Sequence, residues 1–230
     1  MLLGTVSLKE RLVQPEILDG LSPESREARQ ARASLRRINF LMGNFGWFQR
    51  RLRAYVESLP VARPVRALEL GAGDGTLARV LSQDPELAGR LVVTGLDQIP
   101  RPKNWPKDWG WVCGRIEEFA QWQDYSIVFG NLIAHHFVAE DLGRLGSFLG
   151  RFAHLLLFSE PLRALRSVVW LRLISPVLLD PVTRYDAMVS VRAGFQKEEL
   201  PHFLGLPQEK WKVKVETTLW GAYRLEAVRV

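Results

Sequence analysis

Residues 67–77 read Ala-Leu-Glu-Leu-Gly-Ala-Gly-Asp-Gly-Thr-Leu, an apolar strand that runs into a glycine-rich turn and then into a helix. Glycine tolerates the backbone of a tight turn, and it has no Cβ to keep a ligand away from the main chain. The helix amides behind such a turn carry partial positive charge, which suits a carboxylate or another polar ligand group. The segment therefore predicts a ligand-binding turn after a first sheet strand.

The spacing of the glycines separates this turn from two other nucleotide-binding motifs. No Gly-Lys-Ser/Thr follows, so the segment is not a phosphate loop. The Glu-x-Gly-x-Gly-x-Gly pattern of residues 69–75 also lacks the third-glycine spacing of the dinucleotide fingerprint. We therefore favour a nucleoside-type cofactor over a purely structural turn.

A second acidic residue lies one strand–helix–strand unit further along the chain. Asp97 ends the apolar run of residues 91–97. An acid at the end of the second strand can accept hydrogen bonds from the two hydroxyls of a ribose held over the sheet edge. The alternative reading is an exposed loop aspartate.

Strand and helix patterns alternate after residue 65, which predicts a parallel sheet covered by helices on both faces. Strands are expected near residues 65–70, 91–97, 109–113, 124–130 and 153–159. Helices are expected near residues 75–83, 116–121, 140–152, 161–175 and 196–204. Residues 211–218 and 223–230 are two β-like runs at hairpin spacing. Dinucleotide-binding dehydrogenases lack such an ending.

The residues before the sheet predict a loosely attached arm followed by two helices. Residues 1–20 have no strong period. Ser22-Pro23 favours the start of the first helix, because serine caps free amides and proline suits the first helical position. Gly43 and Gly46 should end that helix before a second one at residues 47–59. One face of the first helix is basic and carries Arg26, Arg29, Arg32 and Arg36.

Polar side chains follow the fourth predicted strand. That strand delivers Asn131 to the ligand-binding edge of the sheet, and His135 and His136 come next. Because histidine titrates near neutrality, either one could accept a proton from a substrate hydroxyl. Paired histidines after a strand also serve as packing or capping groups, and the sequence does not distinguish the two. The histidines and the single Cys113 show no metal-ligand spacing, so no metal site is predicted.

Composition sets the broad class of the protein. The chain has 230 residues, 47% of them hydrophobic, and a formal net charge of +6, which allows an anionic partner without identifying one. The single Cys113 excludes an internal disulfide and fits a reducing compartment. Met1-Leu2-Leu3 does not open a secretory signal, and the apolar stretch 168–179 is too short to span a bilayer. These features predict a cytoplasmic protein.

Taken together, these motifs resemble those of the class I S-adenosylmethionine-dependent methyltransferases. The resemblance is carried by Glu69–Gly75, Asp97, Cys113–Glu118, Asn131–Phe137 and the terminal hairpin. The resemblance is close over residues 60–160 and loose over residues 195–230. It implies a Rossmann-like α/β fold with a seven-stranded, mostly parallel sheet and a C-terminal antiparallel hairpin. It also implies an arm and helical cap at residues 1–60, a methyltransferase domain at residues 61–230, and a substrate-covering insert near residues 161–195.

The resemblance implies S-adenosylmethionine as the cofactor, and the residues it assigns to cofactor binding are Glu69, Gly71, Ala72, Gly73, Asp97, Gln98, Ile116, Glu117 and Asn131. Glu69 would help to hold the methionine amine, Asp97 would bind the ribose hydroxyls, and Asn131 would sit near the sulfonium. Arg115 stands where many members have an aspartate. Glu117 or backbone groups would then serve the adenine amino group.

The layout after the fifth strand is similar to a small-molecule group of these enzymes, some of which accompany polyketide or quinone pathways. Tyr185 is the candidate substrate contact in the insert, with Arg184, Asp186 and Arg192 as weaker candidates; a surface loop is the alternative for each. The implied reaction is methyl transfer to a small phenolic or apolar acceptor. O-methylation is favoured, with C-methylation of a quinone-like ring close behind.

Two other functions fit the same cofactor-binding motifs. A non-catalytic cofactor-binding scaffold and an RNA methyltransferase are the alternatives. Nucleic acid is not favoured, because core or rim packing is the better reading of the tryptophans that could stack on bases, namely Trp105, Trp109, Trp111 and Trp122. The basic helix and residues 162–179 could touch an anionic membrane surface, although packing against the domain is favoured. The oligomeric state is open.

Overall fold

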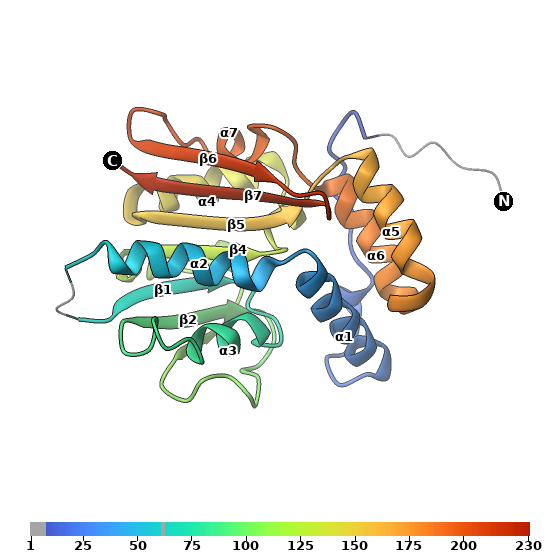
Figure 1. Cartoon of the computed structure of the whole chain (residues 1–230), viewed down its shortest axis with the longest axis horizontal. Coiled ribbons are helices and arrows are strands. Elements are labelled where there is room, and N and C mark those ends of the chain that lie inside the picture. Colours follow the sequence, from blue (N-terminus) through green and yellow to red (C-terminus); the bar gives the residue numbers. More distant parts are fainter. Residues whose placement is uncertain (1–7, 61–62) are drawn as a thin grey trace.

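Seven strands form one sheet in the order β3-β2-β1-β4-β5-β7-β6 (Figure 1). The computed structural model describes residues 8–60 and 63–230, so the first seven residues of the predicted arm lie outside the described residues. The strands are β1 (Val65–Leu70), β2 (Leu91–Asp97), β3 (Gly110–Cys113), β4 (Ile127–Asn131), β5 (Leu155–Pro161), β6 (Trp211–Thr217) and β7 (Ala222–Arg229). Only β7 runs antiparallel to its neighbours, β5 and β6. The predicted mostly parallel sheet with a terminal hairpin is confirmed.

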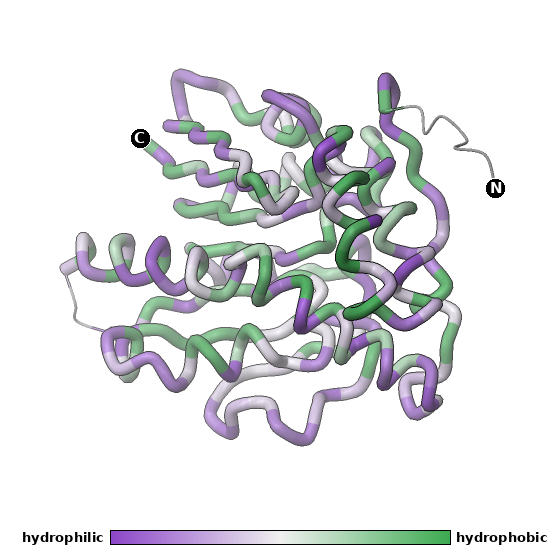
Figure 2. Tube along the Cα trace, turned by 45° about the vertical axis from the view of Figure 1, so that its right-hand side comes forward, coloured by the Kyte–Doolittle hydropathy of each residue, from purple (hydrophilic) through white to green (hydrophobic). Residues whose placement is uncertain are grey.

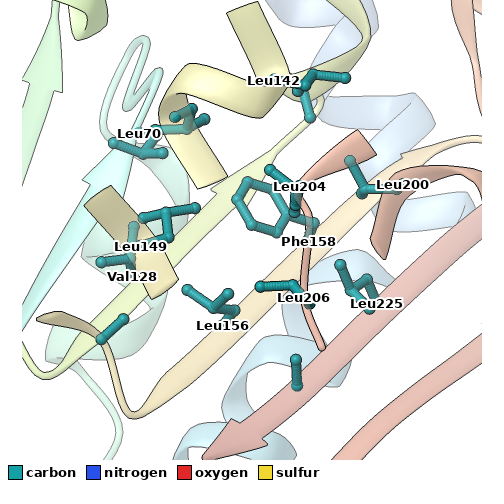
Figure 3. Close-up of a cluster of buried hydrophobic side chains, with 14 of the residues drawn as sticks. Leu70, Val128, Leu142, Leu149, Leu156, Phe158, Leu200, Leu204, Leu206 and Leu225 are labelled. Carbon is teal, nitrogen blue, oxygen red and sulfur yellow. The ribbon is translucent and has the colours of Figure 1, made fainter. Parts of the chain in front are cut away.

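Helices cover both faces of this sheet. They are α1 (Arg26–Leu41), α2 (Asn44–Glu57), α3 (Thr76–Ser82), α4 (Ala139–Phe152), α5 (Leu165–Leu178), α6 (Pro181–Ala193) and α7 (Glu199–Phe203). Alternate residues of a strand face opposite layers. In β4, Ile127 and Phe129 pack with α2 and α3, whereas Val128 packs with α4 and α7 (Figure 3). The strand is therefore apolar on both sides, and each side packs against its own layer of helices, as the sequence pattern predicts.

Helices α1, α5 and α6 lie beyond the carboxyl ends of the parallel strands (Figure 1). They share a smaller apolar cluster that includes Ile38 and Met42 of α1, Val168 and Leu171 of α5, and Val191 of α6. Because α2 packs on the sheet itself, the two N-terminal helices belong to different layers. The predicted division between a cap and a methyltransferase domain at residue 60 stays a prediction.

The structure corrects the predicted helix boundaries before the sheet. Helix α1 begins at Arg26 rather than at Ser22-Pro23, because the side chain of Ser25 accepts a hydrogen bond from the backbone N–H of Ala28 at 3.1 Å. Gly43 makes the break between α1 and α2, with a φ of +68°. Gly46 lies inside α2 and does not interrupt the helix.

Three predicted segments after β3 differ in type or length. The helix expected near residues 116–121 is a single 3-10 turn, Ile116–Glu118. Helix α5 begins four residues later than expected, because β5 extends to Pro161. The segment near residue 185, for which no helix was predicted, is helix α6, capped by Asp180, whose carboxylate accepts from the N–H groups of Val182 and Thr183.

The tryptophans near β3 are packing residues, as predicted. Trp105, Trp109 and Trp122 are buried. An added Cβ on Gly95 of β2 would lie 2.6 Å from the Trp105 ring and 2.7 Å from the Trp111 ring. These rings cover the edge of the sheet and are not free to stack on bases.

Among the described residues, no helix is long and apolar enough to cross a membrane. The cytoplasmic location expected from the sequence stays a prediction.

Candidate functional site

A cavity of about 550 Å³ opens at the carboxyl ends of β1, β2 and β4. The chain runs outward from β1 to β2 and β3 on one side, and from β4 to β5 on the other. In open α/β sheets, ligands bind at this reversal of strand order. The volume lies in the range of sites for small molecules.

The cavity brings together all of the predicted cofactor-binding residues and both histidines. These lining residues are Glu69, Gly71, Ala72, Gly73, Asp97, Gln98, Ile116, Glu117, Asn131, His135 and His136. They come from strand ends and turns between Glu69 and His136. The parallel topology predicted from the sequence is what places them at one edge.

The glycine turn after β1 has the backbone that its sequence requires. Gly71 and Gly73 have φ values of +63° and +54°, a region that favours glycine. An added Cβ on Gly71 would lie 2.7 Å from Ile133, whereas one on Gly73 would meet nothing nearer than the Gly71 carbonyl oxygen at 3.9 Å. The N–H of Gly73 donates to Asp97 Oδ2 at 2.8 Å. The turn is thus held open beside the cavity by the acid at the end of β2.

Glu69 lies under this turn with one carboxylate oxygen unsatisfied. The residue is buried, and Oε2 finds no hydrogen-bond partner within the described part of the chain. Burial, with the nearby charges of Asp97 and Asp74, raises the pKa of Glu69 well above its ordinary value. A buried acceptor without a partner is costly. A cationic ligand group in the cavity would satisfy it.

Asn131 belongs to a network that ties the N-terminal helices to the sheet. Its side chain donates to Asn39 Oδ1 at 2.9 Å and accepts from Asn44 Nδ2 at 3.1 Å. Ser159 of β5 donates to Asn44 Oδ1 at 2.9 Å. Neither Asn39 nor Asn44 was singled out in the sequence, because asparagines inside or at the start of a helix carry no distinctive local signal.

On the other side of the cavity, His135 is clamped between two carboxylates. Its Nδ1 lies 2.7 Å from Glu160 Oε2, and its Nε2 lies 3.3 Å from Glu16 Oε1. Burial alone would lower the pKa of His135, but the hydrogen bonds to Glu16 and Glu160 outweigh it and raise the pKa to about 9. His135 therefore carries a proton at neutral pH, which does not suit the predicted role of a general base.

Glu160 organises the turn that presents the histidines. It is fully buried at the end of β5. Its carboxylate accepts from the backbone N–H groups of Ile133, Ala134 and His135, at 3.1, 2.9 and 3.3 Å. A buried carboxylate with several charge-assisted partners is well satisfied. Glu160 thus holds the 3-10 turn Ala134–His136 through three backbone hydrogen bonds. It also orients the His135 ring through the contact with Nδ1.

We predict that Glu16→Gln lowers the pKa of His135, because it removes one of the two carboxylates that stabilise the charged imidazole. Since the folded-state pKa is raised, His135 stabilises the protein fully below pH 6.5, and this contribution is lost as the pH rises towards 9. NMR titration of the histidine ring protons measures the pKa directly. Glu10→Gln, an exposed position on the same arm, is the matched control. An unchanged His135 titration in Glu16→Gln would contradict the clamp.

His136 is the more available of the two histidines. Its Nδ1 lies 3.4 Å from Asp19 Oδ2, and its ring is 4.3 Å from the His135 ring, centroid to centroid. Within the described residues, no hydrogen bond engages its Nε2. Of the predicted pair, His136 is therefore the one whose surroundings leave a ring nitrogen open.

Glu16, His135 and His136 also offer possible ligand atoms that all lie within 4.8 Å of one another. These residues could hold a divalent ion only if His135 lost its proton and its contact with Glu16. The salt bridges already satisfy the same atoms. We assign no metal to the site.

The arm that carries Glu16 is firmly attached, contrary to the sequence-based expectation. Arg11 donates to the carbonyl oxygens of Ala193, Phe137 and His135, at 2.6, 2.7 and 2.9 Å. Arg163 donates to the carbonyl oxygen of Leu8 at 2.6 Å. These contacts join residues far apart in the sequence, so no local pattern could reveal them.

Helix α6 changes the roles expected for the insert. Asp186 accepts from the N–H groups of Ile17 and Leu18, at 2.8 and 3.0 Å, and so holds the arm over the cavity. Arg184 and Arg192 do not line the cavity either; they contact, respectively, the carbonyl oxygen of Ser175 and the side chain of Gln14.

Tyr185, the predicted substrate contact, does not line the cavity and is 53% exposed. Residues two apart in a helix point in nearly opposite directions, so the helix turns Ala187 inward and Tyr185 outward. Ser190 of the same helix lines the cavity and donates to Glu16. The role of Tyr185 as a substrate contact therefore stays a prediction that the position of its side chain does not support.

Several solved structures resemble this chain. The plantazolicin methyltransferase BpumL, in complex with S-adenosylhomocysteine, has a TM-score of 0.66 and 13% identity, over 90% of this chain and 91% of its own. The methyltransferase domain of bacterial CtHen1 has a TM-score of 0.56 and 12% identity, over 81% and 97%. The citrinin polyketide synthase CMeT domain has a TM-score of 0.55 and 17% identity, over 80% and 52%.

No protein-family model matches the sequence, and no curated protein sequence matches it. The likeness therefore rests on three-dimensional structure, where the sheet order, the terminal hairpin and the position of the cavity agree with the resemblance stated from the motifs. This chain has the fold of the class I S-adenosylmethionine-dependent methyltransferases.

Proposed function

We propose that this protein is an enzyme that binds S-adenosylmethionine and transfers its methyl group to a small acceptor. One observation carries the proposal. A single cavity joins the glycine turn, Glu69 and Asp97 on one side to the histidine pair on the other. The solved structures with this fold include methyltransferases, and several of these structures are complexes with S-adenosylhomocysteine.

The residues on the strand side of the cavity fit the cofactor. The unpartnered Oε2 of Glu69 suits the ammonium of the methionine part. The Asp97 carboxylate at the end of β2 suits the ribose hydroxyls. Gln98, Ile116 and Glu117 lie where the adenine would follow, and Arg115 lies 3.2 Å from Glu117 Oε1. When bound, S-adenosylmethionine supplies an electrophilic methyl group on a sulfonium.

The opposite side of the cavity fits an acceptor that is partly apolar. Phe137, Trp170 and Leu171 line it, and they exclude water from part of the space. Alignment of an acceptor atom in such a site contributes on the order of 7–11 kcal/mol to a displacement reaction. The protein's first task is therefore to position the acceptor.

His136 is the residue we propose to take the acceptor's proton. It lines the cavity, and the open Nε2 can receive a hydrogen bond from a hydroxyl. The charged His135 beside it acts as a positioning residue, since both of its ring nitrogens are engaged by carboxylates. A base in the site favours O-methylation of a phenolic or other small hydroxyl compound over C-methylation.

Methyl transfer from radiolabelled S-adenosylmethionine to pools of small phenols, quinols, RNA and protein tests the proposal. We expect label in the small-molecule pool. His136→Asn should lower kcat by about 10²- to 10⁴-fold while leaving cofactor affinity unchanged. His154→Asn, at an exposed position after α4, is the matched control. EDTA should leave the rate unchanged, because no metal is assigned.

Each alternative function has its own result in this experiment. Cofactor binding without transfer to any pool would identify a scaffold protein. Label in RNA, with binding that weakens steeply as salt rises, would identify an RNA methyltransferase. Full activity of His136→Asn would show that His136 is not the base, but it would leave the proposal of a methyltransferase intact.

A further inference from the structure

Helix α5 carries apolar side chains on its exposed face as well as on its buried one. Its inner face is buried in the cluster shared with α1 and α6. Its outer face exposes four apolar side chains, which we name the α5 stripe: Leu165 (71% exposed), Val169 (49%), Leu173 (74%) and Val177 (84%). Residues four apart stack on one side of a helix. A contiguous row of exposed apolar side chains is uncommon on a soluble protein, so the α5 stripe indicates a partner surface.

The apolar surface continues from α5 onto the β6–β7 hairpin. Leu219 and Trp220, at the hairpin turn, are 81% and 53% exposed. The Trp220 ring lies 6.2 Å from that of Trp170 in α5, centroid to centroid. Figure 2, in which this side of the molecule comes forward, shows the hydrophobic segments along it.

This surface also reaches the rim of the cavity. Trp170, Leu171 and Trp220 line the cavity where α5 and the hairpin meet. An apolar compound held against the outer surface would therefore be next to the acceptor side of the site.

The α5 stripe is flanked by arginines. The only charged residues within α5 are Arg166 and Arg172. Arg37 of α1 donates to the carbonyl oxygen of Leu178 at 3.1 Å, which places a third guanidinium at the end of the helix. None of the three forms an ion pair with any residue that the structure describes. The patch is therefore apolar, basic and free of internal acidic partners.

We propose that the α5 stripe docks on an anionic membrane surface. From Leu165 to Val177 there are 12 steps of 1.5 Å, so the stripe is about 18 Å long, which suits a helix lying in the plane of the interface. The arginines would pair with anionic headgroups while the apolar side chains enter the acyl boundary. A second copy of this chain fits less well, because a two-fold contact would bring the same basic patch against itself.

Sedimentation with vesicles tests this proposal on the full chain. We expect retention on vesicles of phosphatidylglycerol and phosphatidylcholine, and little retention on phosphatidylcholine alone. The double variant Leu173→Asp with Val177→Asp should lose more than 90% of the retention, since charges in the acyl boundary are costly (on the order of tenfold or more in affinity). Val138→Asp with Val230→Asp, two exposed apolar positions elsewhere, should bind like the parent.

The arginines provide a second readout. Arg166→Gln and Arg172→Gln should each weaken binding to the anionic vesicles by about fivefold, and the difference should shrink as salt rises. Binding of S-adenosylmethionine to every variant shows that the fold and the cofactor site are intact, so a failure here is distinguishable from a failure of the proposed function.

Three results would overturn the proposal. The first is no retention on anionic vesicles. The second is retention that survives the Leu173→Asp and Val177→Asp double variant. The third is a dimer by light scattering that the same double variant converts to a monomer, which would assign the α5 stripe to a second copy.

Discussion

Asp97→Ala is expected to weaken the binding of S-adenosylmethionine by about 30- to 1,000-fold, which corresponds to about 2–4 kcal/mol. A carboxylate that accepts from two hydroxyls contributes on this scale in a site with restricted water. Asp97 also accepts from the backbone N–H groups of Gly73 at 2.8 Å and Ile99 at 3.1 Å. Its removal therefore loosens the glycine turn as well as the ribose site. Isothermal titration with S-adenosylmethionine measures the loss.

Two further variants make this result interpretable. Asp97→Asn keeps the shape of the side chain, and it should bind more tightly than Asp97→Ala but less tightly than the parent. Asp108→Ala, at an exposed loop aspartate, should leave the affinity unchanged. If Asp97→Ala is folded and binds at full strength, the cofactor does not lie at the end of β2.

Gly146→Ala is expected to lower the free energy of unfolding by about 1–3 kcal/mol, the usual cost of forcing extra volume into a packed core. Gly146 lies in α4 where the helix crosses the end of α7. An added Cβ would lie 2.0 Å from the Leu204 carbonyl oxygen and 2.6 Å from its carbon. These are backbone atoms, so the two helices would have to separate. Urea denaturation followed by circular dichroism measures the change.

The same helix offers a control of opposite sign. An added Cβ on Gly150 would have no atom within 4 Å. Alanine is favoured over glycine in a helix by about 0.5–1 kcal/mol, so Gly150→Ala should raise the free energy of unfolding. Destabilisation by both substitutions, or by neither, would show that the contact between α4 and α7 is not as close as described.

The strands of the sheet could be predicted from the sequence because each is a short apolar run bounded by turn residues. The observed bounds of β1 and β2 are the predicted ones. The glycine turn and Asp97 could be placed at one edge because parallel topology brings strand ends together. The residues that line the strand side of the cavity could therefore be predicted from local sequence patterns and from the rule that parallel strands end at one edge of the sheet.

The acceptor side of the cavity depends on contacts that no local pattern encodes. Glu16 lies 119 residues from its partner His135. Nothing in the first 20 residues distinguishes this glutamate from its exposed neighbour Glu10. The pKa of His135 follows from that contact, so the two predicted histidines could not be told apart before the arm was placed.

Helix α6 is a different case, because its signal is in the sequence. Asp180-Pro181 is a capping residue followed by a proline at the first helical position. The same pattern of a capping residue before a proline predicts a helix start at Ser22-Pro23, but the helix begins after Ser25. Two serines close together offer two caps, and only the packing of α1 selects between them.

The attachment of the N-terminal arm has a consequence for which compounds the cavity of this protein could admit. Arg163 and Asp186 hold the arm through its main-chain groups at Leu8, Ile17 and Leu18, whereas Arg11 and Glu16 hold it through their own side chains. Arm positions that make none of these contacts can be exchanged to admit larger or smaller compounds without rebuilding the sheet beneath.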